Sequence, residues 1–149
     1  RQGAPTVYYG DEAGVCGFTD PDNRRTYPWG HEDKELIDFH KAAIKMHKEN
    51  EVLRTGSYKQ LYSAHNVIAY GRFTSDDAVI VVVNNGEDEI RVNIPAWETG
   101  LAMDDDVEQI MVTFEGGYST DRQGYRLKDG ILNIGLRKTS ATVLRRLRW

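Results

Sequence analysis

The sequence predicts a mainly β protein in which an antiparallel β-sandwich of Greek-key type follows a single strand–loop–helix (βα) unit. After residue 55, short runs rich in β-branched and aromatic residues recur at regular intervals with turn residues between them, which is typical of a sandwich. Before residue 55, one strand-like run is followed by one helical pattern. The composition, 40% hydrophobic and 28% charged, is that of a globular domain, so the 149-residue chain is expected to fold.

The βα unit opens with the run PTVYY at residues 5–9. Its β-branched and aromatic residues, closed by Gly10, predict a buried strand. Residues 33–49, DKELIDFHKAAIKMHKE, place apolar side chains at the three-and-four spacing of an amphipathic helix. Asp33 is expected to cap this helix, because its carboxylate can accept hydrogen bonds from free amides of the first turn.

The second half predicts a series of short strands. The runs are YKQLY (58–62), VIAYGRF (67–73), AVIVVVN (78–84), EIRVNI (89–94), EQIMVTF (108–114), GILNIGL (130–136) and ATVLRRL (141–147). Asn84, Asn85 and Gly86 predict a tight hairpin, since Asn and Gly readily adopt positive φ angles. We therefore expect a domain boundary near residue 55, with one domain over residues 1–54 and a sandwich over residues 55–149.

The connection between Gly10 and the helix is unusually long. A connection in a βα unit usually takes about 2–6 residues, whereas this one takes roughly 20. Connections of this length are commonly functional, and in α/β folds ligands bind where they leave the carboxyl ends of the strands. The position of the loop therefore predicts a binding site.

The side chains of the loop suit a neutral, polyhydroxylated ligand. Asp20 and Arg24 offer carboxylate acceptors and a guanidinium fork that could bracket paired hydroxyls. Phe18, Tyr27 and Trp29 add flat apolar faces on which a sugar ring could stack. The glycines of the loop lack the Gly-Lys-Ser/Thr sequence of a phosphate-binding loop, so phosphate binding is not supported.

Three motifs in this part of the chain resemble a known family. The order GAPTVYYGDEAGV (3–15), DPDNRR (20–25), a tryptophan, an amphipathic helix and VLRTGSY (52–58) resembles the α-amylase family of glycoside hydrolases. The likeness is greatest to its neopullulanase, cyclomaltodextrinase and maltogenic amylase group. It implies that residues 1–54 are the last strand, loop and helix of a (β/α)8 barrel and that residues 55–149 are the C-terminal β-sandwich domain.

The resemblance also implies roles for individual residues. Asp20 and Arg24 match the family's Asp-Pro-x-x-Arg element, which holds a glucose unit on the non-reducing side of the scissile bond. The family's three catalytic carboxylates, which perform retaining hydrolysis, would lie upstream of these residues. We therefore expect no catalytic residue in this chain, an inactive fragment when it is alone, and an active parent enzyme that uses no cofactor.

Partners and location follow from the same reasoning. We expect an α-glucan or maltooligosaccharide substrate and, because the chain begins Arg1-Gln2-Gly3 without a methionine, a missing N-terminal part of the same polypeptide. A net charge of −4 argues against nucleic-acid or anionic-membrane partners, and no apolar run reaches the roughly 20 residues of a membrane helix. The single cysteine, Cys16, is expected to be a small packed side chain and fits a cytoplasmic protein, with secretion left open.

Other interpretations of these residues stay open. Asp20 and Arg24 could be a surface ion pair, and Tyr27 and Trp29 could anchor the loop. Neighbouring Asp11 and Glu12 point opposite ways in an extended segment, which favours a structural role over shared acid–base chemistry.

Potential metal ligands and the chain end are interpreted as structural. His40 and His47 lie about two helical turns apart, and Asp104, Asp105 and Asp106 lack calcium-loop spacing, so no metal site is expected. The run LRRLRW predicts a final strand with Leu147 or Trp149 on its buried face.

A second class of function also remains. The sandwich itself could be a non-catalytic carbohydrate-binding or interaction module, with aromatic residues such as Tyr118 or Tyr125 contacting sugar.

Overall fold

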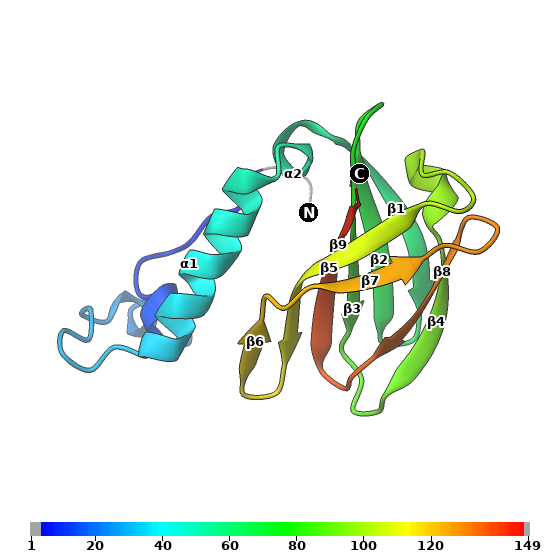
Figure 1. The fold of residues 1–149 in the computed structure, drawn as a ribbon. Coiled ribbons are helices and arrows are strands. Elements are labelled where there is room, and N and C mark those ends of the chain that lie inside the picture. Colours follow the sequence, from blue (N-terminus) through cyan, green and yellow to red (C-terminus); the bar gives the residue numbers. More distant parts are fainter. Residues whose placement is uncertain (1–3, 148–149) are drawn as a thin grey trace. The chain divides into compact units, whose positions relative to one another are not determined.

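The computed structural model describes residues 4–147 and divides the chain into two compact units, Arg1–Glu49 and Asn50–Trp149 (Figure 1). Strands predominate in the second unit, every strand pairing is antiparallel, and the single long helix lies in the first unit. The prediction of a mainly β, antiparallel fold preceded by one helical segment is therefore confirmed.

The first unit consists of a loop and a helix. Its elements are the short 3-10 helices η1 (Asp11–Ala13) and η2 (Asp22–Arg24) and the helix α1 (Lys34–Glu49). Asp33 caps α1 as predicted, because its Oδ1 accepts a hydrogen bond of 2.9 Å from the Leu36 amide. The Asp33 amide in turn donates to the carbonyl of the buried Ala13 at 3.2 Å, which joins η1 to the start of α1.

The predicted buried strand at residues 5–9 is wrong. These residues are irregular, and the side chains of Val7, Tyr8 and Tyr9 are exposed. A strand of a parallel sheet forms only when neighbouring strands accept and donate its backbone hydrogen bonds. Within residues 4–147, no strand pairs with this segment, so its β-forming side chains have no sheet to join.

Up to residue 147, where the described part ends, the second unit consists of a short helix followed by nine strands. Its elements are α2 (Val52–Thr55), β1 (Ser57–Ala64), β2 (Val67–Phe73), β3 (Ala78–Asn84), β4 (Ile90–Pro95), η3 (Ala96–Thr99), β5 (Asp106–Phe114), β6 (Gly117–Ser119), β7 (Gln123–Arg126), β8 (Ile131–Leu136) and β9 (Ser140–Arg146). All seven predicted runs form strands. Strands β6 and β7 were not predicted, because they are only three and four residues long and largely polar.

The strands form two sheets (Figure 1). The larger has seven strands in the order β1-β2-β3-β9-β5-β6, with β7 also pairing with β5, and the smaller consists of β4 and β8. The last strand, β9, therefore lies between β3 and β5, although it is distant from both in sequence. This arrangement makes β3 a central strand, and its run AVIVVVN is almost entirely buried.

Both sheets contribute alternate side chains to one hydrophobic core. Its fully buried members include Ala69, Ile80, Val82, Ile94, Leu132, Ile134 and Leu144. On β4 and β8, the buried residues alternate with exposed polar ones, as the two-residue period of a half-buried strand requires. The outer face of the smaller sheet is therefore a polar surface.

The predicted hairpin at residues 84–86 is wrong. Strand β3 pairs with β2 and β9, whereas β4 pairs with β8, so residues 84–86 carry the chain from one sheet to the other. The amide group of the buried Asn84 donates to the carbonyls of Asp88 (2.9 Å) and Arg137 (2.8 Å) and accepts from the Gly86 amide (2.9 Å). Asn84 therefore organises a crossing between sheets, and the predicted positive φ angles belong elsewhere, for example to His65 between β1 and β2.

Candidate functional site

The loop between η1 and α1 is held by short-range hydrogen bonds. Oδ2 of Asp22 accepts from the Phe18 amide at 3.0 Å, and the Asp22 amide donates to the Thr19 carbonyl at 2.9 Å. The backbone passes so close to Gly17 that a Cβ there would lie 2.6 Å from Cα of Asn23. Only glycine fits at that position without moving the backbone, so the loop has a defined shape.

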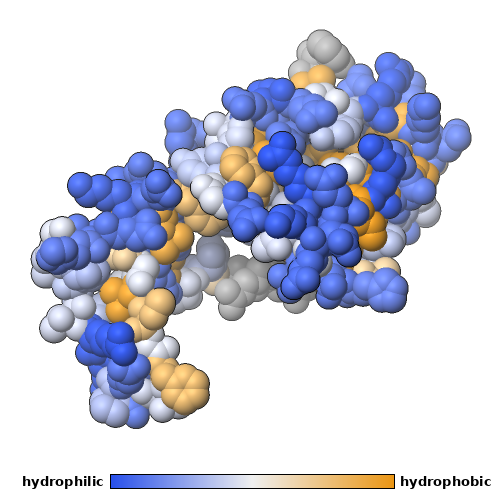
Figure 2. Space-filling view, turned by 90° about the horizontal axis from the view of Figure 1, so that it is seen from below, coloured by the Kyte–Doolittle hydropathy of each residue, from blue (hydrophilic) through white to orange (hydrophobic). Residues whose placement is uncertain are grey.

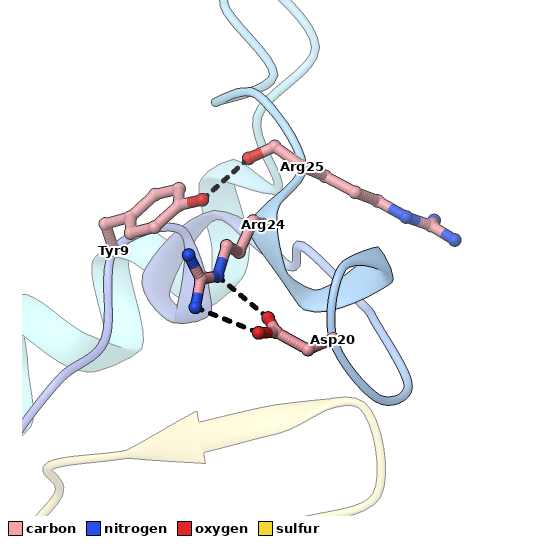
Figure 3. A network of polar contacts seen from close by, with 4 residues as sticks. All are labelled: Tyr9, Asp20, Arg24 and Arg25. Carbon is pink, nitrogen blue, oxygen red and sulfur yellow. Dashed lines mark hydrogen bonds and ion pairs between the residues drawn. The ribbon is translucent and has the colours of Figure 1, made fainter.

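Asp20 and Arg24, the two predicted substrate-binding residues, pair with each other (Figure 3). Nε of Arg24 donates to Oδ1 of Asp20 at 2.8 Å, and Nη2 donates to Oδ2 at 2.9 Å. The side chain of Arg24 remains 68% exposed and that of Asp20 remains 60% exposed. This two-point contact fixes the guanidinium plane relative to the carboxylate and leaves other N–H groups and lone pairs facing solvent.

Tyr9 ties the preceding segment to the same loop (Figure 3). Its hydroxyl donates to the carbonyl of Arg25 at 3.0 Å, directly after Arg24. The Arg25 side chain points the other way and donates to Oδ1 of Asp22 at 2.6 and 3.0 Å. Arg25, followed by the Phe18 amide, lowers the pKa of Asp22 below its ordinary value of 3.8, so this carboxylate is stabilised in its charged form.

Aromatic side chains of the loop are at the surface. The rings of Tyr27 and Trp29 lie 4.6 Å apart at 49°. Trp29 is 80% exposed and Phe18 is 87% exposed, and hydrophobic residues reach the surface among hydrophilic ones in Figure 2. The same loop therefore exposes both apolar rings and a polar pair, the two kinds of group that can contact the apolar faces and the hydroxyls of a sugar.

Asp11 and Glu12 each bind the backbone. Oδ2 of Asp11 accepts from the Tyr8 amide at 3.0 Å, and Oε2 of Glu12 accepts from the Gly10 amide at 3.1 Å. These contacts support the structural role that the sequence favoured. The prediction for Cys16 is wrong, since its thiol is exposed on the loop.

The remaining candidates have structural contacts. Nδ1 of His40 lies 2.8 Å from the Leu36 carbonyl, and Asp104 and Asp105 form ion pairs with Arg126 and Arg146. Over residues 4–147, no group of three His, Cys, Asp or Glu side chains could hold a metal ion.

Two further expectations concern the chain end and membranes. Strand β9 ends at Arg146, Leu147 is half-buried, and Trp149 lies outside the described residues. In the part of the chain that the structure describes, no helix has the length and apolar character needed to span a membrane.

Sequence comparison relates the chain to enzymes that act on α-glucans. It is 45% identical over 96 residues to an amylopullulanase of Thermoanaerobacter thermohydrosulfuricus and 42% identical over 85 residues to a cyclomaltodextrinase of Thermoanaerobacter pseudethanolicus. These matches cover 57% and 56% of this chain. The chain spans only 6% and 15% of those relatives' own lengths. No family model matches the chain.

Structural comparison gives the same relationship. An α-amylase of Anoxybacillus is 25% identical and superposes with a TM-score of 0.76 over 95% of this chain and 28% of its own. The chain is a homologue of α-amylase-family glycoside hydrolases. The resemblance noted from the three sequence motifs is thus confirmed, as is the antiparallel fold.

Tyr9 and Gly17 were not predicted as residues that shape the loop of Asp20 and Arg24. Tyr9 was assigned to a buried strand, because its neighbours are β-branched and aromatic, whereas its hydroxyl holds the loop. Gly17 offers only the weak signal of a glycine between polar residues; its close approach to Asn23 appears once the loop is folded.

Proposed function

We propose that this chain is the C-terminal part of an α-glucan-acting glycoside hydrolase. In this proposal, residues 1–54 complete a (β/α)8 catalytic barrel and residues 55–149 form the C-terminal sandwich domain. The loop around Asp20 and Arg24 then forms part of the substrate cleft. The relatives named amylopullulanase and cyclomaltodextrinase support this assignment.

The Asp20–Arg24 pair is the observation that carries the proposal. Within residues 4–147, neither side chain hydrogen-bonds to any residue other than its partner. Each therefore keeps free hydrogen-bonding positions beside an already fixed partner. A vicinal pair of sugar hydroxyls can donate to the carboxylate and accept from the guanidinium, and both hydrogen bonds are charge-assisted.

The first unit also presents apolar side chains that a larger barrel would cover. Six large hydrophobic residues of this unit are more than two-fifths exposed, and α1 has no buried residue. They are Val7, Tyr8, Tyr9, Phe18, Trp29 and Ile44. Because large apolar side chains at a surface commonly mark an interaction site, we infer that they pack against the preceding part of the same polypeptide.

In this proposal, Asp20 and Arg24 bind and orient one glucose unit. They do not act on the reacting bond. Carboxylates from the preceding part of the barrel supply the nucleophile and the general acid/base of a retaining hydrolase. Holding the sugar against a fixed pair reduces the freedom lost on reaching the transition state, so the pair contributes to kcat/KM.

The test uses the complete polypeptide with maltoheptaose as substrate. Asp20→Asn and Arg24→Met each remove a charge-assisted hydrogen bond, and we expect kcat/KM to fall roughly 10- to 100-fold, corresponding to about 1.5–3 kcal/mol. Glu49→Gln is the matched control, because Glu49 forms an exposed ion pair with Lys45 at the same i,i+4 spacing on α1. The 149-residue chain alone is expected to give no turnover.

Two outcomes would contradict the proposal. Unchanged kcat/KM in both Asp20→Asn and Arg24→Met would remove the pair from the cleft. Hydrolysis of maltoheptaose by the pure 149-residue chain would show that the catalytic carboxylates lie within it.

We also infer a cytoplasmic location for the parent enzyme. The exposed thiol of Cys16 supports it, because a free exposed thiol persists in a reducing compartment and is prone to oxidation outside it.

A further inference from the structure

A groove on the outer face of the smaller sheet has no role in the function proposed above. It is shallow and open to solvent, has a volume of about 470 Å3, and lies where β4 begins and β8 ends. Its lining residues are Glu89, Ile90, Arg91, Gly135, Leu136 and Arg137. The groove belongs entirely to the second unit, whereas the Asp20–Arg24 pair belongs to the first.

The floor of the groove is Gly135, and Arg91 lies across it. The two residues are directly opposite in the β4–β8 pairing, and a Cβ on Gly135 would lie 3.3 Å from Nη2 of Arg91. The absence of a side chain therefore lets the guanidinium lie close to the sheet. Nη1 of Arg91 donates to Oδ1 of Asn133 at 2.7 Å, which fixes the guanidinium in this position.

Arg91 and Asn133 are the first members of a row of polar side chains that extends beyond the groove. Nδ2 of Asn133 donates to Oδ1 of Asn93 at 2.7 Å, and these two residues are also directly opposite in the sheet. Residues i and i+2 of a strand are about 6.7 Å apart, so the row of side chains from Glu89 through Arg91 to Asn93 is roughly 13 Å long. This length suits an oligomeric ligand better than a single small ion.

The groove offers both donors and acceptors. Arg137 lies over the Phe114 ring at 5.4 Å, and across residues 4–147 neither it nor Arg91 forms an ion pair. Glu89 adds a carboxylate to the same lining. Two guanidinium groups alone would suit an oxyanion, but the Glu89 carboxylate would repel one. A ligand whose hydroxyls both donate and accept satisfies all three groups.

We propose that this groove is a second, non-catalytic binding site for a neutral α-glucan chain. The choice of an α-glucan rests on the proposed function, while the donor and acceptor pattern rests on the groove itself. Arg91 and Arg137 donate to sugar hydroxyls, Glu89 accepts from them, and Gly135 lets the chain approach the sheet. Such a site would keep the enzyme on a polymeric substrate between catalytic events.

The experiment is a titration of the 149-residue chain with maltoheptaose, followed by 1H–15N NMR. Saturable shifts are expected at the amides of residues 89–91 and 135–137. Arg91→Met should weaken this binding by about tenfold or more, because it removes a charged donor. Arg126→Met is the control, since Arg126 is also an exposed arginine of the second unit and lies outside the groove lining.

The outcomes separate this proposal from the previous one. Shifts that persist in the double variant Asp20→Asn/Arg24→Met and weaken in Arg91→Met support glucan binding in the groove. This result is independent of whether kcat/KM of the complete enzyme depends on Asp20 and Arg24. Shifts that are absent from residues 89–91 and 135–137, or equal weakening by Arg126→Met, overturn it. Saturable shifts with sodium sulfate but none with maltoheptaose also overturn it, because they would assign the groove to oxyanions.

Discussion

The Asp22 carboxylate shapes the loop that carries the candidate site through two contacts within that loop. It accepts from the Phe18 amide and from Arg25, so it connects the two sides of the loop that presents Asp20 and Arg24. Both contacts favour its charged form and lower its pKa. Because the folded pKa lies below the unfolded one, this contribution to loop stability is present above the ordinary value and is lost as pH falls through the folded value.

Arg25→Met should therefore raise the pKa of Asp22. The substitution removes the Arg25 hydrogen bond, which is the largest cause of the lowered pKa, and leaves the Phe18 amide as a favourable contact. The pKa of Asp22 should therefore rise toward its ordinary value of 3.8 and stay below it. The measurement is a pH titration of the Asp22 carboxyl carbon by NMR. Lys45→Met, which changes a lysine on α1, should leave the titration of Asp22 as it is. An unchanged pKa in Arg25→Met would contradict the assigned cause.

The side-chain contacts of single residues were predictable where the partner lies within a few residues in sequence. The cap at Asp33 depends on an amide three residues away, and the Asp20–Arg24 pair depends on an i,i+4 spacing. The hydroxyl of Tyr9 reaches a carbonyl 16 residues away, and this contact leaves no signal in the sequence pattern. The exposure of Cys16 likewise depends on what covers the loop.

At the scale of elements, the loop depends on a close backbone approach at Gly17. Gly17→Ala would place a Cβ 2.6 Å from Cα of Asn23 and 2.8 Å from the carbonyl oxygen of Asp22, so the backbone must move. We expect shifted amide signals over residues 18–25 in 1H–15N NMR and unchanged signals over the sandwich, because the two units are separately compact.

Gly124→Ala provides the control for this change. An added Cβ at Gly124 would meet no atom within 4 Å, and its signals should change only locally. If Gly17→Ala leaves the signals of residues 18–25 in place, the loop is not held by the close approach at this glycine.

The strands of the sandwich were predictable because their burial alternates with a two-residue period or fills both faces of a central strand. Two elements were assigned wrongly for a shared reason. Residues 5–9 lack the neighbouring strands that would make them a strand, and residues 84–86 have the turn residues of a hairpin but connect two sheets. In both cases the pairing partner, which the local sequence does not specify, decides the structure.

In the molecule as a whole, the two units differ in how much of their hydrophobic surface they bury. The sandwich shares one core between two sheets, whereas the first unit has an exposed apolar surface and a helix without a buried residue. In the function proposed above, a longer polypeptide covers this surface, and the related hydrolases that the chain matches are themselves much longer than the matched region.

The mass of the native polypeptide decides whether this chain is part of a larger hydrolase. An antibody raised against the 149-residue chain, used on a denaturing gel of the source cells, reports that mass. We expect a band several-fold above the 17.0 kDa of this chain. A single band near 17.0 kDa would contradict it, because the catalytic part of the proposed barrel would then be missing from the polypeptide.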